Sequence, residues 1–385
     1  MVSKALVITR NFPPVAGGME RLNFHVYRAL AERFEVDVCG PAGASDYRVA
    51  GGNFIGLPLS PLAGFLIRAQ WHAARLARRG RPAFVYAGSG LTAPAAYLGA
   101  KLVGAKSLCF LHGLDIVVKH PLYRAWVLPI LRRFDLLLVN SRNTAALAER
   151  AGVPASRIAV LHPGVTLPDW QRRSDARSEF RVAYGIGNRP LILAAGRLTE
   201  RKGLAAFISK ALPRVISHVP NALLVIVGAE PEQALKHRSG VMQTIRQAVT
   251  ETALEQSVVL LGGVDDRLLD DAYFAADVMV FPVLDLPGDV EGFGMVAVEA
   301  AAHGLPTVGF AVGGVPDAVA EGVSGYLMPA GDYAGLADAI VARLRLGNSE
   351  ELARGAYRFA EQFSWERFDR DLLALIDERL LGPPG

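Results

Sequence analysis

The sequence predicts an α/β protein built from two doubly wound domains. Short runs rich in β-branched and aliphatic residues alternate with segments of helical periodicity along the whole chain, which is the pattern of stacked βαβ units. The predicted strands are almost continuously apolar, as expected for parallel strands covered by helices on both faces. The chain has 385 residues, and this length favours two domains over one.

The first half of the chain contains six predicted strands, each followed by a turn and a helical segment. They are KALVITR (4–10), FEVDVCG (34–40), AFVYAG (83–88), SLCFLHG (107–113), DLLLVNS (135–141) and RIAVLHP (157–163). The alternation stops between residues 166 and 189, where the sequence is polar and rich in proline, glycine and charge. We interpret this segment as the connection between the domains, with a short helix inside it.

The alternation of strands and helices restarts after this connection. The predicted strands are LILAAGR (191–197), ALLVIVGAE (222–230), SVVLLGGV (257–264), DVMVFPV (277–283), PTVGFAVGG (306–314) and GYLMPA (325–330). The predicted domains therefore cover residues 1–168 and 169–363, and ligands are expected at the carboxyl ends of the strands. A last helix is predicted in SWERFDRDLLALIDERLL (364–381).

The composition is that of a globular protein. Apolar residues make up 51% of the chain, far from a disordered composition. The first residues contain no apolar run long enough for a signal peptide, and no window approaches the roughly 18 apolar residues of a transmembrane helix. Cys39 and Cys109 each lie in a predicted strand, where buried free thiols of a reducing compartment are expected. We therefore expect a cytoplasmic protein.

Charge is unevenly distributed along the chain. Residues 1–170 hold 20 Lys and Arg against 9 Asp and Glu, a balance of +11, whereas residues 171–385 hold 21 against 28, a balance of −7. The first half is therefore predicted to meet an anionic partner. The usual nucleic-acid-binding motifs are absent from the sequence, so a membrane surface or a phosphorylated acceptor is favoured over nucleic acid.

Two basic segments, 65–81 and 119–135, carry much of this charge. In the first, Phe65, Leu66 and Trp71 interleave with five arginines, which suggests an amphipathic basic helix. Anionic lipid attracts such faces by about 1 kcal/mol per basic residue. We expect peripheral docking on the inner face of the plasma membrane through the first domain, and ordinary solvated helix faces are the alternative.

The stretch EGFGMVAVEAAAHG (291–304) follows a predicted strand and a proline-containing loop. Gly292 and Gly294 would allow the main chain to approach a ligand closely, and the helix that follows presents free N–H groups to an anion. Glu291, before the helix, and Glu299, about two turns inside it, are suited to accept hydrogen bonds from hydroxyl groups. The alternative is a solvated loop acid and a surface helix acid.

A second group of candidate residues lies in LILAAGRLTERKGL (191–204). Arg197 and Lys202 follow the predicted strand and precede a helix. A fork-shaped guanidinium together with an ammonium is a common way to bind phosphate. Solvated loop cations are the alternative for this pair, and the neighbouring Arg201 is expected to lie at the surface.

Two candidate groups belong to the first domain. Gly17 and Gly18, in NFPPVAGGMERL (11–22), precede a predicted helix and would allow close approach of a phosphate, although a plain turn explains them equally well. His112 and Asp115, in CFLHGLDIV (109–117), follow another predicted strand. His112 is either a structural residue or a donor to a sugar hydroxyl or phosphate oxygen.

Several catalytic motifs are missing from the sequence. It contains no Walker A loop, no HExxH, no zinc-type Cys/His spacing, no Asp-x-Asp metal clamp and no Gly-x-Ser-x-Gly. We therefore expect no metal and no cofactor. Phosphate charge would be neutralised by Arg197, Lys202 and the helix that begins after Gly294.

Together these groups of residues resemble the retaining GT-B glycosyltransferases of family 4 (group 1), which transfer a sugar from a nucleotide-diphosphate donor. The spacing of Glu291 and Glu299 is the most specific feature. The resemblance spans nearly the whole chain through GGMERL (17–22), HGLD (112–115), GRLTERKG (196–203), GGVDD (262–266), EGFGMVAVEA (291–300) and GGVPDAV (313–319).

The resemblance implies two Rossmann-like domains that face across a cleft, with residues 364–385 crossing back to the first domain. Arg197 and Lys202 would bind the donor diphosphate, Glu291 the transferred sugar and Glu299 the ribose. The other residues implied in donor binding or catalysis are Gly17, Gly18, His112, Val264, and the main chain of Phe293, Gly294 and Met295.

The family resemblance also implies a retaining hexosyltransferase that needs no metal. GDP-mannose is slightly favoured as the donor and a UDP-hexose stays open, with a lipid-linked or glycan acceptor in cell-envelope polysaccharide or glycolipid synthesis. A GT-B-type nucleotide-sugar epimerase and a non-catalytic nucleotide-sugar binder are the alternatives. An epimerase would interconvert the free nucleotide sugar without an acceptor, and a binder would show no turnover.

Overall fold

The computed structural model describes residues 3–15, 17–49, 51–230, 240–347 and 349–382. The chain divides into two compact units. Unit 1 contains Met1–Gly164 and Trp365–Gly385, and unit 2 contains Val165–Ser364. The boundaries expected from the sequence followed residues 168 and 363.

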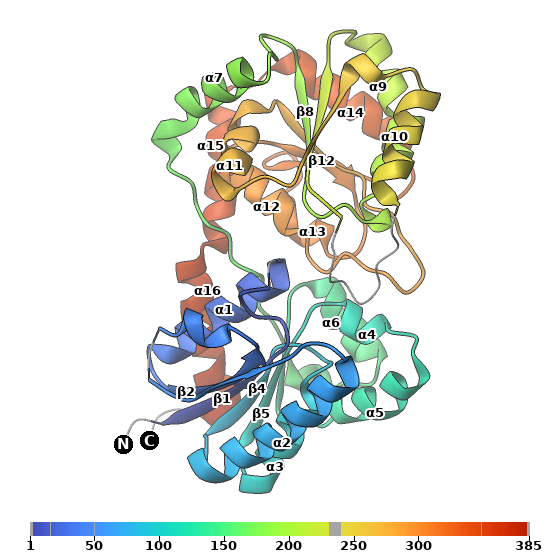
Figure 1. Cartoon of the computed structure of the whole chain (residues 1–385). Coiled ribbons are helices and arrows are strands. Elements are labelled where there is room, and N and C mark those ends of the chain that lie inside the picture. The colour runs from blue at the N-terminus through green and yellow to red at the C-terminus, as the bar shows by residue number, and fades with distance from the viewer. Residues whose placement is uncertain (1–2, 16, 50, 231–239, 348, 383–385) are drawn as a thin grey trace. The chain divides into compact units, whose positions relative to one another are not determined.

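Unit 1 is built on a parallel sheet of seven strands in the order β3-β2-β1-β4-β5-β6-β7 (Figure 1). Six of these strands were predicted. The strand missing from the prediction is β3, which has only four residues, lies at the sheet edge and contains Gly56. The strands are β1 Lys4–Ile8, β2 Glu35–Pro41, β3 Phe54–Leu57, β4 Phe84–Ala87, β5 Lys106–Leu111, β6 Leu136–Val139 and β7 Ile158–Val160.

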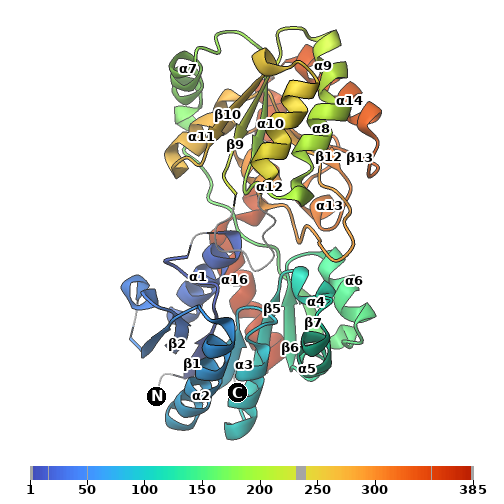
Figure 2. The same cartoon turned by 45° about the vertical axis from the view of Figure 1, so that its right-hand side comes forward.

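Helices cover both faces of the unit 1 sheet. Helices α2, α3 and α5 lie on one face, and α1 and α16 pack together on the other (Figures 1 and 2). The last helix of the chain therefore packs on unit 1, as the family resemblance implied. The helices are α1 Gly18–Ala31, α2 Leu62–Gly80, α3 Ala93–Val103, α4 Leu114–Val117, α5 Pro121–Leu131, α6 Arg142–Arg150 and α16 Trp365–Leu375, which continues as a π-helical turn to Leu381.

Unit 2 is built on a parallel sheet of six strands in the order β10-β9-β8-β11-β12-β13. All six strands were predicted, because each is a continuous apolar run bounded by polar or glycine-containing turns. The strands are β8 Leu191–Ala195, β9 Leu223–Val227, β10 Val258–Gly262, β11 Val278–Phe281, β12 Thr307–Phe310 and β13 Gly325–Met328.

The unit 2 sheet also has helices on both faces. Helices α8, α9, α10 and α14 lie on one side, and α7, α11, α12 and α15 on the other (Figures 1 and 2). Helix α7 is the short helix expected within 166–189, and it packs against α11 inside unit 2. The helices are α7 Arg173–Ala183, α8 Leu204–Lys210, α9 Leu212–His218, α10 Val241–Glu251, α11 Asp266–Ala275, α12 Met295–Ala302, α13 Val315–Ala318, α14 Tyr333–Leu346 and α15 Glu350–Ala360.

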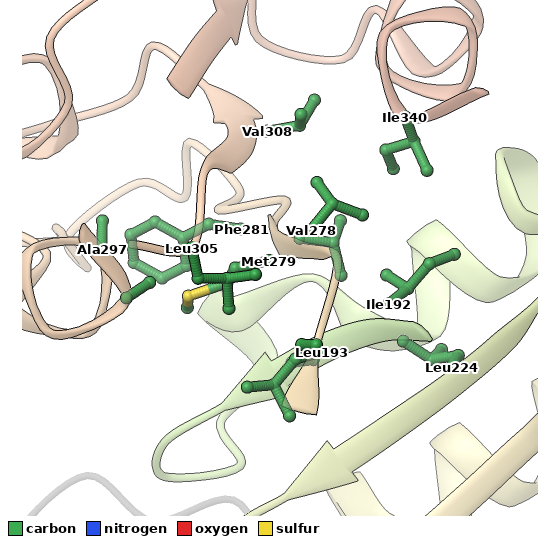
Figure 3. Packing of buried hydrophobic residues seen from close by; sticks show 14 of the residues in the cluster. Ile192, Leu193, Leu224, Val278, Met279, Phe281, Ala297, Leu305, Val308 and Ile340 are labelled. Carbon is green, nitrogen blue, oxygen red and sulfur yellow. The ribbon is translucent and has the colours of Figure 1, made fainter. Parts of the chain in front are cut away.

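The core of unit 2 explains why its strands are apolar at every position. Successive residues such as Ile192 and Leu193 point to opposite faces of β8, and both are fully buried. Figure 3 shows these side chains with Ile340 of α14 and Ala297 of α12, which belong to helices on opposite sides of the sheet. A polar residue at either strand position would be buried without a partner.

The cysteines behave as expected. Cys39 on β2 and Cys109 on β5 are both buried and free. Within the described residues, no helix combines the length and the apolarity that crossing a bilayer requires.

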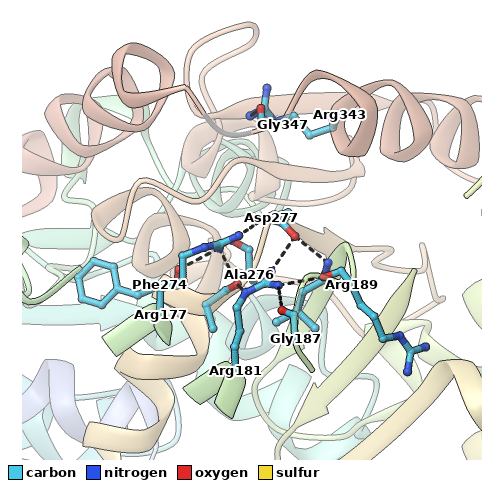
Figure 4. A network of polar contacts seen from close by, with 11 residues as sticks. Arg177, Arg181, Gly187, Arg189, Phe274, Ala276, Asp277, Arg343 and Gly347 are labelled. Atoms are coloured by element: carbon cyan, nitrogen blue, oxygen red, sulfur yellow. Dashed lines mark hydrogen bonds and ion pairs between the residues drawn. The ribbon is translucent and has the colours of Figure 1, made fainter. Parts of the chain in front are cut away.

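An ion-pair network attaches α7 to the sheet of unit 2 (Figure 4). Arg177 and Arg181 of α7 donate to the two oxygens of Asp277, at 2.6 and 2.9 Å. Asp277 also accepts from the Leu191 N–H at the start of β8, at 2.7 Å. One carboxylate therefore links α7 to the adjacent starts of β8 and β11.

Replacement of Asp277 by alanine should destabilise unit 2 strongly. Arg181 would keep its charge in a nearly buried position without the carboxylate that compensates it, and breaking such a pair costs about 3 kcal/mol or more. Urea unfolding of Asp277→Ala and of Asp338→Ala would measure the difference. Asp338 pairs with Arg214 at the exposed surface of the same unit, so its loss should change the free energy of unfolding very little.

Candidate functional site

The strand order of unit 2 has its switch point at the carboxyl ends of β8 and β11. The chain passes from β8 to β9 on one side and from β11 to β12 on the other, so beyond their loops the two connections lead to opposite sides of the sheet. Ligands of doubly wound sheets bind at such a switch point. The loops after β8 and β11 carry five of the predicted site residues: Arg197, Lys202, Glu291, Phe293 and Gly294.

The loop after β8 packs closely against the loop after β11. Gly203 ends the short 3₁₀ turn Glu200–Lys202 with φ of 69°. A Cβ atom at this position would lie 2.0 Å from the carbonyl oxygen of Pro282, which follows β11. The Leu284 N–H donates to the carbonyl oxygen of Arg201 at 2.8 Å. Only glycine therefore fits at residue 203, and this packing fixes the spacing of the loops.

Glu291 is the centre of a buried ionic cluster. Its Oε2 atom accepts from Lys202 Nζ at 2.9 Å and from Arg201 Nε at 3.1 Å, and the residue is only 8% exposed. Arg201 also donates to Asp289. Burial would raise the pKa of Glu291, but Lys202 and Arg201 outweigh it and lower the pKa to about 2. A solvated loop acid, the alternative reading of Glu291, is therefore wrong.

The expectation that Arg201 lies at the surface is also wrong. Its side chain is 13% exposed and pairs with both Glu291 and Asp289. Sequence reasoning failed here because Arg201 and Lys202 are adjacent, and a strand or helix would turn them apart. The 3₁₀ turn instead directs both cations to one carboxylate.

Lys202 is held in a largely apolar position. Its Nζ lies 4.5 Å from the centre of the Phe281 ring, a cation–π contact. Burial lowers the pKa of Lys202, an effect that Glu291 partly opposes. Arg197 is exposed on the same loop and adds positive charge near Lys202. Arg197 and Lys202 thus lie on the same loop, where Arg197 is exposed and the Lys202 side chain is nearly buried.

Helix α12 begins beside this cluster. Gly294 precedes it with φ of 100°, and a Cβ atom at Gly294 would lie 3.1 Å from the Phe281 ring. The side chain of Phe293 is buried and packs against Phe363. Phe293 can therefore offer a ligand only its main chain, whereas Met295 is half-buried in the first turn.

Glu299 lies on α12, where a neighbouring helix holds its carboxylate. Tyr273 of α11, which is 1% exposed, donates its hydroxyl to Glu299 Oε2 at 3.1 Å. Tyr273 has no signal in the sequence, because nothing there relates the facing sides of α11 and α12. Val264 follows β10, the edge strand that β9 separates from β8, so it lies outside the cluster around Glu291.

The candidate residues of unit 1 follow β1 and β5. Gly17, with φ of 155°, precedes α1, and Gly18 is its first residue. Asp115 accepts from the backbone N–H of His112 at 2.8 Å and of Gly90 at 3.1 Å, so it holds the turns after β5 and β4. Asp115 therefore has a structural role.

His112 is buried with a defined hydrogen bond. Its Nε2 lies 2.9 Å from the carbonyl oxygen of Gly88. A carbonyl oxygen only accepts, so Nε2 carries a proton and donates to it. In the tautomer whose one ring proton is on Nε2, Nδ1 is an acceptor, whereas the donor role expected from the sequence would need a proton on Nδ1 as well.

Comparison with known proteins identifies the family. The model for "Glycosyltransferase Family 4" matches residues 16–167, and the model for "Glycosyl transferases group 1" matches residues 189–345. A GDP-mannose-dependent alpha-(1-6)-phosphatidylinositol monomannoside mannosyltransferase of Mycobacterium tuberculosis is 30% identical over 378 residues, 92% of each chain. The chain belongs to glycosyltransferase family 4.

Other similar proteins agree with this family. The mannosyltransferase of the same description from Mycolicibacterium smegmatis is 28% identical to the glycosyltransferase over 344 residues, 87% of each chain. Among solved structures, HepE of Anabaena in complex with UDP has a TM-score of 0.76 at 20% identity, covering 97% of this chain and 99% of its own. The glycosyltransferase therefore has the GT-B fold, as the family resemblance implied.

The ionic cluster predicts a specific pH dependence of stability. A carboxylate whose pKa is lowered by folding stabilises the protein above the ordinary value of 4.5, and the contribution is lost as the pH falls toward about 2. The free energy of unfolding should therefore fall less steeply between these pH values in Glu291→Gln than in the wild type. Urea titrations at several pH values measure how the free energy of unfolding of each protein changes with pH. Equal slopes for the wild type and Glu291→Gln would contradict a lowered pKa of Glu291.

Proposed function

We propose that this glycosyltransferase is a retaining, metal-independent enzyme that moves mannose from GDP-mannose to a lipid-linked acceptor. The observation that carries the proposal is the cluster of Lys202, Arg201 and Glu291 at the switch point of unit 2, next to the start of α12. Cations and free N–H groups suit a diphosphate, and carboxylates suit the hydroxyls of a sugar and a ribose.

In this proposal Arg197 and Lys202 bind the donor diphosphate. Breaking the bond between the sugar and the phosphate leaves negative charge on the nucleotide diphosphate. Preorganised cations in a poorly solvated position stabilise such charge effectively, and Lys202 is positioned in this way by Phe281 and Glu291. With Arg197, Lys202 and the start of α12 supplying positive charge, a metal ion is not required.

The acids and the main chain would orient the donor. Glu291 would accept from hydroxyls of the transferred sugar, and Glu299, held by Tyr273, from the ribose. The N–H groups at Gly294 and Met295, together with the main chain of Phe293, would contact sugar and phosphate. Val264 would lie against the base.

We propose a contribution from unit 1 as well. His112, with Nδ1 as the acceptor, would bind a hydroxyl of the sugar. Gly17 and Gly18, at the start of α1, would allow the main chain to approach the diphosphate.

Retention follows from attack on the same face of the sugar as the leaving group. The acceptor oxygen bonds to the anomeric carbon while the bond from this carbon to the phosphate oxygen breaks, and the acceptor proton passes to the leaving phosphate. A double displacement would instead need a nucleophilic carboxylate at the anomeric carbon. Glu291, with Oε2 engaged by two cations, is a poor nucleophile.

The donor and acceptor are proposed from the relatives. The mycobacterial relatives are described as GDP-mannose-dependent and as acting on phosphatidylinositol monomannoside. We propose GDP-mannose and a glycolipid of the cell envelope for this chain.

Lys202→Ala should reduce kcat by about a hundredfold or more, by analogy with the loss of a preorganised oxyanion donor. The measurement is product formation from GDP-mannose and a phosphatidylinositol mannoside, with UDP-hexoses in parallel and with EDTA present. Lys210→Ala, on the exposed end of α8, is the matched control and should keep wild-type activity.

Near-normal turnover in Lys202→Ala would refute the proposed donor site. Loss of activity with EDTA would refute metal independence, and interconversion of the free donor without acceptor would indicate an epimerase.

A lipid acceptor requires access to a membrane, and one face of unit 1 suits this. Helices α2, α3 and α5 lie on the same side of the sheet and contain no Asp or Glu. Trp71 and Ile67 on α2 and Trp126 and Leu122 on α5 are 58–71% exposed. Helix α2 also carries four arginines and α5 carries Arg124, and Arg75 stacks on Trp71. We propose that this face, the basic helix layer, docks on anionic lipid.

One detail of the sequence-based description of this surface is wrong. Phe65 was expected among the aromatic residues of the basic face, but it is fully buried in the core of unit 1. Phe65, Ala69 and Ala73 are buried at intervals of four residues, so they define the inner face of α2.

The wild-type protein should co-sediment at low salt with vesicles containing phosphatidylglycerol and not with phosphatidylcholine vesicles. The double variant Trp71→Ser with Trp126→Ser should bind more weakly, because the apolar anchors are lost while the charge is kept. Val182→Ser, which changes an exposed valine of unit 2, is the control. Absence of binding to anionic vesicles, or binding unchanged in the double variant, would contradict docking through this face.

A further inference from the structure

The ionic cluster raises a question of charge. Arg201 and Lys202 face Asp289 and Glu291, so two cations balance two carboxylates. A donor diphosphate brings further negative charge and, in the proposed function, engages Lys202. Glu291 must then keep its orientation and charge while one of its two cations is shared with phosphate.

The two oxygens of Glu291 are not equivalent. Oε2 accepts from both Arg201 and Lys202. Among the described residues, none forms a hydrogen bond with Oε1. The side chain of Glu291 is 11% exposed. Oε1 is therefore the oxygen available to a ligand hydroxyl, and the bonds to Oε2 set its direction.

Arg201 is fixed more firmly than Lys202. Its Nε donates to Glu291 and its Nη1 donates to Asp289. Its carbonyl oxygen accepts from Leu284 on the loop after β11. Asp289 itself closes a tight turn, with its N–H donating to Leu286 at 3.1 Å. The guanidinium of Arg201 contacts two carboxylates, and the main chain of the residue is hydrogen-bonded as well. These contacts keep the guanidinium in one orientation.

We infer that Arg201, oriented by Asp289, is a positioning residue that keeps Glu291 ionised and Oε1 directed at the donor sugar, so that Lys202 is free to bind the diphosphate. This inference rests on the proposed function. It assigns Arg201 and Lys202 different tasks although both contact the same oxygen.

A pH profile separates this role from a merely structural one. The charged groups acting on Glu291 are Lys202 and Arg201, and both lower the pKa of its carboxyl. With donor bound and Arg201 replaced by methionine, Glu291 would depend on a lysine shared with phosphate, so its pKa would rise. The acid limb of kcat against pH should therefore move to higher pH in Arg201→Met.

The experiment compares steady-state kinetics with GDP-mannose across pH for the wild type, Arg201→Met, Asp289→Asn and the double variant. We expect kcat in Arg201→Met to fall by roughly tenfold to a hundredfold, as for a misplaced reacting group, with a smaller change in the donor KM. Asp289→Asn should shift the acid limb in the same direction by less. The double variant should match Arg201→Met, because the two residues act as one unit.

The matched control is Arg214→Met, which removes an arginine paired with an aspartate at the exposed surface of the same unit and should leave kinetics unchanged. A wild-type acid limb and kcat in Arg201→Met would overturn the inference. If Arg201→Met fails to fold, Asp289→Asn tests the inference instead. An unshifted acid limb of kcat in Asp289→Asn would then overturn it. Wild-type activity in Lys202→Ala and Glu291→Gln would instead overturn the proposed function itself.

Discussion

One carboxylate oxygen shared by two cations organises the candidate site. Burying the Glu291 carboxylate or the Lys202 ammonium alone would be costly, and each makes the burial of the other tolerable. Their contact also joins the loop after β8 to the loop after β11. The spacing of these loops in turn sets where the start of α12 lies relative to Lys202, and the proposed donor site depends on that spacing.

The parallel sheet explains why these groups meet although 89 residues separate Lys202 from Glu291 in the sequence. Neighbouring parallel strands end at the same edge, and at β8 and β11 the connections lead to opposite sides of the sheet, so side chains from both loops can meet at this edge. Unit 1 has its own switch point at β1 and β4, and the turn after β4 contacts the His112 turn through the His112–Gly88 hydrogen bond. The candidate residues of each unit therefore gather at the carboxyl ends of its strands.

The fold could be predicted because its strands are buried on both faces. This condition gives continuous apolar runs such as Leu191–Ala195, which the sequence displays directly. Strand β3 lacks the signal because it is short, half-buried and at the edge. On α2 the buried side is marked by the four-residue spacing of Phe65, Ala69 and Ala73, a pattern that the many arginines of the helix obscure in the sequence.

The site could be predicted only in part. Lys202 and Glu291 stand in recognisable motifs, so their proximity was expected. The positions of Arg201, Asp289 and Tyr273 depend on local turns and on how two helices pack, which residue spacing does not encode. Arg201 and Tyr273 hold the carboxylates of Glu291 and Glu299, and Asp289 holds Arg201, contacts that are visible only in three dimensions.

The two buried cysteines have a practical consequence for chemical labelling. Burial raises the pKa of Cys39 to about 12 and also raises the pKa of Cys109. The nucleophile in alkylation is the thiolate, which neither residue provides at neutral pH while the protein is folded. The native cysteines of the folded protein should therefore react very little with maleimide probes. A single cysteine introduced at the surface can then carry a fluorophore or spin label without prior removal of the native thiols.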